Sequence, residues 1–114
     1  MEDIFSIIQF LRQAVKTGAS DEHLMVGHAP YLRINGFIKK VTSQPLTKED
    51  IDNAILDIAP TSIRDKILTL CDVDFMYEIK GCSRFRINYN RQLGMPGLVI
   101  RNIPYEIPKL KELS

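Results

Sequence analysis

Two neighbouring segments in the second half of the sequence alternate between apolar and polar residues, and no other feature constrains the fold as strongly. From Val73 to Ile79 the odd-numbered residues are apolar, and the even-numbered ones, except Met76, are acidic. The alternation resumes at Phe85 and continues to Tyr89, with arginine or asparagine at the even-numbered positions. Successive side chains of a β-strand point to opposite faces, so both segments are predicted to be strands that bury one face only.

The register between these two strands follows from their alternation. Both strands must bury the same face, so the numbers of paired residues must have an even sum. A three-residue loop over residues 80–82 meets this condition, whereas a two-residue loop would set Tyr77 opposite Arg86. The resulting register sets Tyr77 opposite Phe85, Glu78 opposite Arg84 and Met76 opposite Arg86. Arg84 therefore has a carboxylate partner available on its own face, and Arg86 has none.

Arginines are concentrated in the stretch from residue 82 to residue 104, which contains Arg84, Arg86, Arg91 and Arg101. The glycines and proline of residues 94–97 predict a loop, and Leu98 to Ile103 predicts the last strand. On that strand Arg101 shares a side with Val99 and Ile103. Apolar neighbours on the same face are unusual for a solvated arginine.

The first forty residues predict one helix and three short strands. A helical apolar stripe runs between Asp3 and Thr17, and it consists of Ile4, Ile8, Leu11 and Val15, with Phe5 and Ile7 widening it. Gly18 is expected to end this helix. A face packed on a sheet is the simplest interpretation of the stripe, and a partner-binding helix is the alternative. Strands are expected over residues 23–26, 31–34 and 37–41, with a tight hairpin turn at Asn35-Gly36.

Two further helices are predicted before the alternating segments. Thr47 and Asp50 match a capping box, and the helix that follows continues to about Ile58. Its predicted buried residues are Ile51, Ala54, Ile55 and Ile58. After Pro60, a second helix is expected from Thr61 or Ser62 to Leu70, with an apolar side made of Ile63, Ile67 and Leu70. These elements together predict an α+β fold with an antiparallel sheet of about five to six strands and about three helices.

Length and charge exclude several classes of protein. The 114 residues suit a single domain with one core. A net charge of +1 provides no overall field to attract nucleic acid or an anionic membrane, so we expect no nucleic-acid partner. The acidic N-terminus is unlike a signal peptide and indicates a cytoplasmic protein. Cys71 and Cys82 match no zinc spacing and are expected to be plain, partly buried thiols.

No complete catalytic site is predicted. The glycine-rich residues 94–97 contain no lysine and lead into a strand, so they do not form a Walker loop. Asp21 lies near His23 and would suit acid–base chemistry, but Ser20-Asp21 is more typical of a turn or helix cap. His23 and His28 lack neighbouring cysteines or carboxylates in a ligand pattern, so no metal site is predicted.

Several segments resemble PilT-type motor ATPases, the twitching-motility branch of the type II/IV secretion ATPase superfamily. Residues 18–24 read GASDEHL and are similar to the family's GASDLHL. Residues 84–88 read RFRIN, like the family's RFRVN, and residues 101–104 fit its R-x-I-P pattern. The remaining matches are Gly27, Pro30, Arg33 and Gly36 in a G-x-x-P-x-x-R-x-x-G pattern, Asp74-Phe75, and Leu110 with Leu113. The order and gaps agree along essentially the whole chain.

The resemblance implies that residues 1–104 form the PAS-like N-terminal domain of a hexameric motor, and that residues 105–114 begin a linker to a RecA-like ATPase domain. It implies that the domain closes over nucleotide bound to the RecA-like domain of its own or a neighbouring subunit. Arg86 and Arg101, and with less support Arg84, are the residues expected to approach the phosphates. The cofactors, ATP and Mg²⁺, would belong to the whole protein, which would work in type IV pilus retraction or type II secretion at the inner membrane.

The sequence departs from the family pattern at two places. Glu22 stands where the family has an apolar residue, which leaves open how deeply that turn is buried. Residues 93–96 lack the family's Asn-Arg-Gly pattern, which weakens assignment to the retraction branch but not to the wider family. The alternative hypothesis is a stand-alone PAS-like sensor or protein-interaction module.

Overall fold

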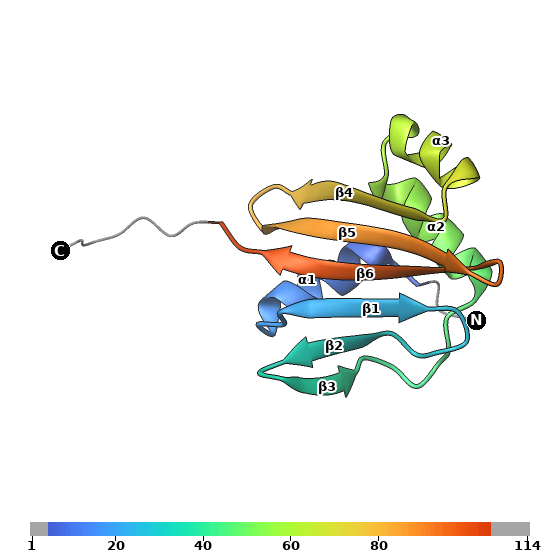
Figure 1. Ribbon diagram of the computed structural model, residues 1–114. Coiled ribbons are helices and arrows are strands. Elements are labelled where there is room, and N and C mark those ends of the chain that lie inside the picture. Colours follow the sequence, from blue (N-terminus) through green and yellow to red (C-terminus); the bar gives the residue numbers. More distant parts are fainter. Residues whose placement is uncertain (1–4, 106–114) are drawn as a thin grey trace.

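The computed structural model describes residues 5–105, which form an α+β fold with a six-stranded antiparallel sheet (Figure 1). The elements are α1 (Ile7–Lys16), β1 (Asp21–Met25), β2 (Tyr31–Ile34), β3 (Phe37–Lys40), α2 (Lys48–Ile58), α3 (Thr61–Thr69), β4 (Asp72–Ile79), β5 (Ser83–Gln92) and β6 (Met95–Ile103). The strand order is β3-β2-β1-β6-β5-β4. The predicted fold class is confirmed.

One face of the sheet is covered by helices and the other is open. Figure 1 shows α1 and α2 behind the sheet and α3 beside the β4 edge. Buried side chains from the strands, such as Phe85, Ile87, Leu98 and Ile100, meet the buried face of α2. That face consists of Ile51, Ala54, Ile55 and Ile58, as predicted. Burial of these apolar side chains is the main stabilising contribution, at roughly 25 cal/mol per Å² of apolar surface removed from water.

The predicted register of the central hairpin is confirmed. Residues 80–82 form the loop between β4 and β5, and the paired residues are Tyr77 with Phe85, Glu78 with Arg84 and Met76 with Arg86. The β2–β3 turn also forms as predicted, with positive φ angles of 52° at Asn35 and 83° at Gly36. Asparagine and glycine are the residues that adopt this left-handed conformation most readily.

The first helix differs from its prediction in its start and in its buried face. It begins at Ile7 because the Ser6 hydroxyl caps it, accepting a hydrogen bond from the Gln9 amide at 3.3 Å. Residues 1–4, including Ile4, lie outside the described residues. The fully covered face consists of Ile7, Phe10, Leu11 and Ala14, so Ile8 and Val15 lie at its margin.

The last strand begins earlier than predicted. The turn consists of Leu93 and Gly94, both with positive φ, and residues 95–97 are part of β6 rather than a loop. Pro96 pairs with Arg91, whose amide donates to the Cys71 carbonyl instead of across to β6. Proline, which has no N–H, therefore occupies a pair that needs no hydrogen bond between these strands.

Smaller corrections concern α3 and the cysteines. The helix ends at Thr69 and leaves Leu70 extended and 48% exposed, so only Ile67 of the predicted stripe is fully buried. Both cysteines are free, but Cys71 is exposed and only Cys82 is partly buried. Among residues 5–105, no helix is long and apolar enough to cross a membrane.

Candidate functional site: an arginine pair on the open face

The register of the sheet aligns polar side chains across its open face. One row crosses all six strands and consists of Met76, Arg86, Arg101, Asp21, Arg33 and Ile38. The row joins the beginning of β1 to the end of β6, which are eighty residues apart in the chain. The two arginines with the strongest expectation of a functional role are therefore direct cross-strand neighbours.

Arg86 and Arg101 are both exposed, and within residues 5–105 neither guanidinium takes part in an ion pair or hydrogen bond. Like charges directly opposite each other on a sheet are destabilising, because their side chains begin only about 5 Å apart. A hollow of about 450 Å³ lies over the pair and is lined by Asp74, Arg86, Asn88, Val99 and Arg101. The arrangement offers two guanidinium groups to an anion from outside the domain.

Arg84 lies in a different environment from the other two arginines. It faces Glu78 as predicted, but the Glu78 carboxylate accepts a 2.6 Å hydrogen bond from the Tyr105 hydroxyl instead. The Arg84 guanidinium lies 5.7 Å from the centroid of the Tyr105 ring, as a cation–π contact. The Glu78 hydrogen bond also raises the pKa of Tyr105. Arg84 is thus tied to local structure, unlike Arg86 and Arg101.

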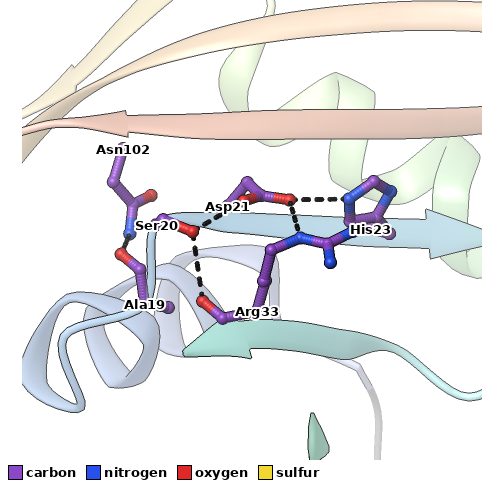
Figure 2. A network of polar contacts seen from close by, with 6 residues as sticks. All are labelled: Ala19, Ser20, Asp21, His23, Arg33 and Asn102. Carbon is purple, nitrogen blue, oxygen red and sulfur yellow. Dashed lines mark hydrogen bonds and ion pairs between the residues drawn. The ribbon is translucent and has the colours of Figure 1, made fainter. Parts of the chain in front are cut away.

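Asp21 begins β1 and lies at the centre of a polar cluster rather than in the predicted turn (Figure 2). One carboxylate oxygen accepts from the Ser20 hydroxyl at 2.7 Å, and the other contacts His23 Nε2 at 2.8 Å and Arg33 Nε at 3.3 Å. Partial burial alone would raise the pKa of Asp21, but these three hydrogen bonds outweigh it, and the pKa lies below its usual value.

The cluster is braced by an aromatic contact. The His23 ring stacks on Tyr31, with centroids 4.8 Å apart. Asp21 is the direct cross-strand neighbour of Arg101, but its carboxylate is held by groups from β1 and β2 (Figure 2). Among the described residues, no group of three or more metal-ligating side chains is present.

Asp74, the acidic residue in the hollow, is also held by a neighbour. Asn88 Nδ2 donates to an oxygen of Asp74 at 3.0 Å and to one of Asp72 at 2.7 Å. The Asn88 oxygen accepts from Asn90 Nδ2 at 3.0 Å. Asn88 and Arg33 belong to the RFRIN and G-x-x-P-x-x-R-x-x-G motifs of the sequence, which predicted a role for neither residue. The contact of Arg33 with Asp21 depends on the pairing of β1 with β2, which was not predicted. The position of Asn88 opposite Asp74 does follow from the predicted β4–β5 register, and only its hydrogen bonds were missed.

Glu22 lies on the covered face of β1, directly beneath this row. It is 0% exposed, so the segment is deeply buried although a glutamate replaces the family's apolar residue. Neither carboxylate oxygen has a hydrogen-bond partner among the described residues, and the same holds for Asn102 Oδ1. Burial raises the pKa of Glu22 to about 8, an effect that the neighbouring Asn102 amide reduces only in part. Glu22 is therefore mostly protonated at neutral pH.

A larger cleft, of about 620 Å³, lies away from the arginines, between the beginnings of α1 and α2 and the segment from residue 41 to residue 47. The charged side chains that line it are Glu49 and Asp50. An acidic rim disfavours phosphate, so the smaller hollow over Arg86 and Arg101 is the better candidate for an anion site.

Comparison with curated proteins finds relatives that cover nearly all of the chain. The type IV pilus retraction ATPase PilT of Pseudomonas aeruginosa is 33% identical over 108 residues, which are 95% of this chain and 31% of PilT. The type IV pilus ATPase PilU of the same organism is 30% identical over 93% of this chain and 28% of PilU. A twitching motility protein of Neisseria gonorrhoeae is 26% identical over 96% of this chain and 29% of that protein. The chain thus spans about a third of the length of these relatives.

Solved structures also match nearly all of the chain. The pilus retraction motor PilT with bound ADP has a TM-score of 0.82 and 35% identity, covering 96% of this chain and 32% of that one. The Legionella pneumophila ATPase DotB has a TM-score of 0.76 at 23% identity, and the match covers 98% of this chain and 33% of DotB. This second match shows a likeness of fold alone. No family model matches the chain. The resemblance inferred from the GASDEHL, RFRIN and R-x-I-P segments is confirmed.

Proposed function

We propose that the chain acts as the N-terminal domain of a hexameric PilT-type motor ATPase. The proposal starts from its match to that domain in sequence and fold. In this role it closes over nucleotide held by a RecA-like domain and presents Arg86 and Arg101 to the phosphates. The observation that carries the proposal is the pair itself: two exposed cross-strand guanidinium groups over a hollow, with no internal partner among residues 5–105.

The chemistry of arginine suits this task. Its guanidinium remains charged at all physiological pH values and presents a planar fork that matches phosphate oxygens. In phosphoryl transfer, such a group stabilises the charge that develops on the transferred phosphate. Contacts to the terminal phosphate also make the position of the domain depend on whether that phosphate is present. The motor thereby converts hydrolysis into domain movement.

Arg84 takes a lesser part in this proposal. Its contact with Tyr105, which in turn binds Glu78, supports a structural role at the end of the sheet. ATP and Mg²⁺ would be bound by the RecA-like domain, because this chain contains no Walker loop. The division into a domain of residues 1–104 and a linker from residue 105 is part of the proposal, and residues 106–114 lie outside the described residues.

The remaining elements of the proposal concern the setting of the motor. Its partners are the RecA-like domain of the same or a neighbouring subunit and a type IV pilus or type II secretion machinery at the inner membrane. The motor works in the cytoplasm, peripheral to that membrane. The curated names of the relatives, which include pilus retraction and twitching motility, favour the pilus over secretion.

The test is ATP turnover by the full-length protein that contains this domain. Arg86→Ala and Arg101→Ala should each lower turnover by roughly a thousandfold or more, the range for loss of a phosphate-stabilising arginine. Arg64→Ala is the matched control, because Arg64 is on α3 and, among residues 5–105, its guanidinium bonds only to its neighbour Thr61. Turnover that is unchanged in both variants, with the fold intact, would exclude this assignment.

The alternative function is a stand-alone PAS-like sensor or protein-interaction module, and the cleft of about 620 Å³ favours it. A small molecule bound there would raise the melting temperature of the chain at micromolar concentration. Substitution of Asn53 in the cleft should remove that shift, and Arg86→Ala should leave it unchanged. A panel of metabolites that shifts no melting temperature would count against this alternative.

A further inference from the structure

An exposed arginine pair with carboxylates nearby is at risk of internal neutralisation. Asp74 lines the same hollow as Arg86 and Arg101. Asp74 pairs with Asn88, two residues along β5 from Arg86, so the two charged side chains are diagonal neighbours on one face. Diagonal neighbours on a sheet start about 7–8 Å apart, within reach of an arginine side chain. An ion pair between them would occupy the guanidinium fork that the proposed function needs.

Asn88 holds the Asp74 carboxylate by a hydrogen bond. Both of its amide hydrogens are engaged, one by Asp74 at 3.0 Å and the other by Asp72 at 2.7 Å. The neighbours of Asn88 fix the orientation of its side-chain amide. Ionised carboxylates only accept hydrogen bonds, so the NH₂ group faces Asp72 and Asp74. On the other side, Asn90 Nδ2 donates to the Asn88 oxygen at 3.0 Å. The Asp74 carboxylate therefore has a bound position on the β4 side of the hollow.

The carboxylate on the other side of the arginine pair is held in a similar way. Asp21 is the cross-strand neighbour of Arg101, but Ser20, His23 and Arg33 engage its oxygens. Both acidic side chains that flank the pair thus have internal partners, and both guanidinium groups have none among the described residues.

We propose that Asn88 is a positioning residue that keeps Asp74 off Arg86, so that the guanidinium pair remains open for phosphate oxygens. The proposal rests on the function proposed above for the nature of the anion, but the clamp itself is a property of this chain. Removal of the Asn88 amide frees the Asp74 carboxylate to pair with Arg86. The site then carries its own competitor for phosphate.

The test uses the chain with tripolyphosphate as the probe, and it has two readouts. The first is the dissociation constant of tripolyphosphate, which Asn88→Ala should raise about fivefold, the upper range for an exposed ion pair. The second is the NMR signal of the Arg86 Nε–H group, which should shift in Asn88→Ala without any probe. Asn88→Val serves as a second variant, because valine favours strand structure.

A double-mutant cycle separates the clamp from a direct contact of Asn88 with phosphate. In an Asp74→Asn background, Asn88→Ala should alter neither the affinity nor the Arg86 signal. Asp72→Asn is the matched control, because Asp72 also bonds to Asn88 but does not line the hollow, and in that background the effect should persist. An effect of equal size in the Asp74→Asn background would overturn the proposal, as would an Arg86 signal that does not respond to Asn88→Ala.

Failure of the proposed function has a different signature. Tripolyphosphate affinity that is the same for the wild type and Arg86→Ala would exclude the anion site. The Arg86 Nε–H signal would still decide whether Asn88 restrains Asp74.

Discussion

Glu22 is a fully buried carboxyl group with no hydrogen-bond partner for either oxygen among the described residues. Burial without a partner is tolerated here because the group is neutral, which avoids the several kcal/mol that a buried isolated charge would cost. Its pKa is about 8 in the folded state, against 4.5 for an unperturbed glutamate. The folded domain therefore holds a proton that the unfolded chain releases near pH 4.5.

The pH dependence of stability follows from this difference. Stabilisation by the bound proton is fully present below pH 4.5 and is lost as the pH rises to about 8, at up to about 1.4 kcal/mol per pH unit. Glu22→Gln should remove this slope between pH 5 and pH 8 and raise the free energy of unfolding most at pH 8. Urea unfolding of both proteins at several pH values measures the free energy of unfolding and its slope with pH.

The exposed Glu49 supplies the control for this prediction. Glu49→Gln should keep the wild-type slope, since that side chain lies at the surface of α2. A Glu22→Gln variant whose free energy of unfolding still falls from pH 5 to pH 8 would contradict the buried-acid account.

At the scale of elements, the start of α2 is fixed by a capping box whose two residues, Thr47 and Asp50, line the 620 Å³ cleft. The Thr47 hydroxyl accepts from the Asp50 amide at 3.1 Å, and the Asp50 carboxylate accepts from the Thr47 amide at 2.9 Å. Thr47→Ala should lower the free energy of unfolding by about 1 kcal/mol, because the amide of Asp50 loses its partner. Urea unfolding measures this loss.

A nearby residue gives the comparison for the cap. Ser62 is an exposed residue in the first turn of α3, and the helix has no side-chain cap. Ser62→Ala should be neutral or slightly stabilising, since alanine has the higher helix propensity. If Thr47→Ala and Ser62→Ala had equal effects, the cap would contribute nothing specific.

The elements that the sequence predicts well are those whose signal is local. The β4–β5 register followed from alternation and a short loop, and the α2 boundaries followed from Thr47, Asp50 and Pro60. The start of β6 was missed because Leu93, a bulky residue, adopts a positive φ in the turn. The pairing of β1 with β6 carries no local signal at all. For that reason the sequence did not reveal that Asp21 and Arg101 are neighbours or that Glu22 is buried.

The whole molecule combines a covered face built for stability with an open face that carries an electrostatic cost. Arg86 and Arg101 are like charges directly opposite each other, at a position where an uncharged pair would be more stable. Functional sites commonly retain such unfavourable arrangements, and replacing them raises stability while lowering activity. The open face of this domain is expected to show the same trade-off.

Arg101→Thr should therefore raise the free energy of unfolding by about 0.5 kcal/mol at low salt, through loss of repulsion and gain of strand propensity. The gain should shrink at 1 M salt, where the Debye length falls to about 3 Å. Lys40→Thr is the control, because Lys40 is a strand cation that faces Tyr31 rather than another charge. Urea unfolding at two salt concentrations gives the comparison. A lower stability for Arg101→Thr at low salt would mean that Arg101 holds the sheet together, and the pair would then be structural instead of a site held open for phosphate.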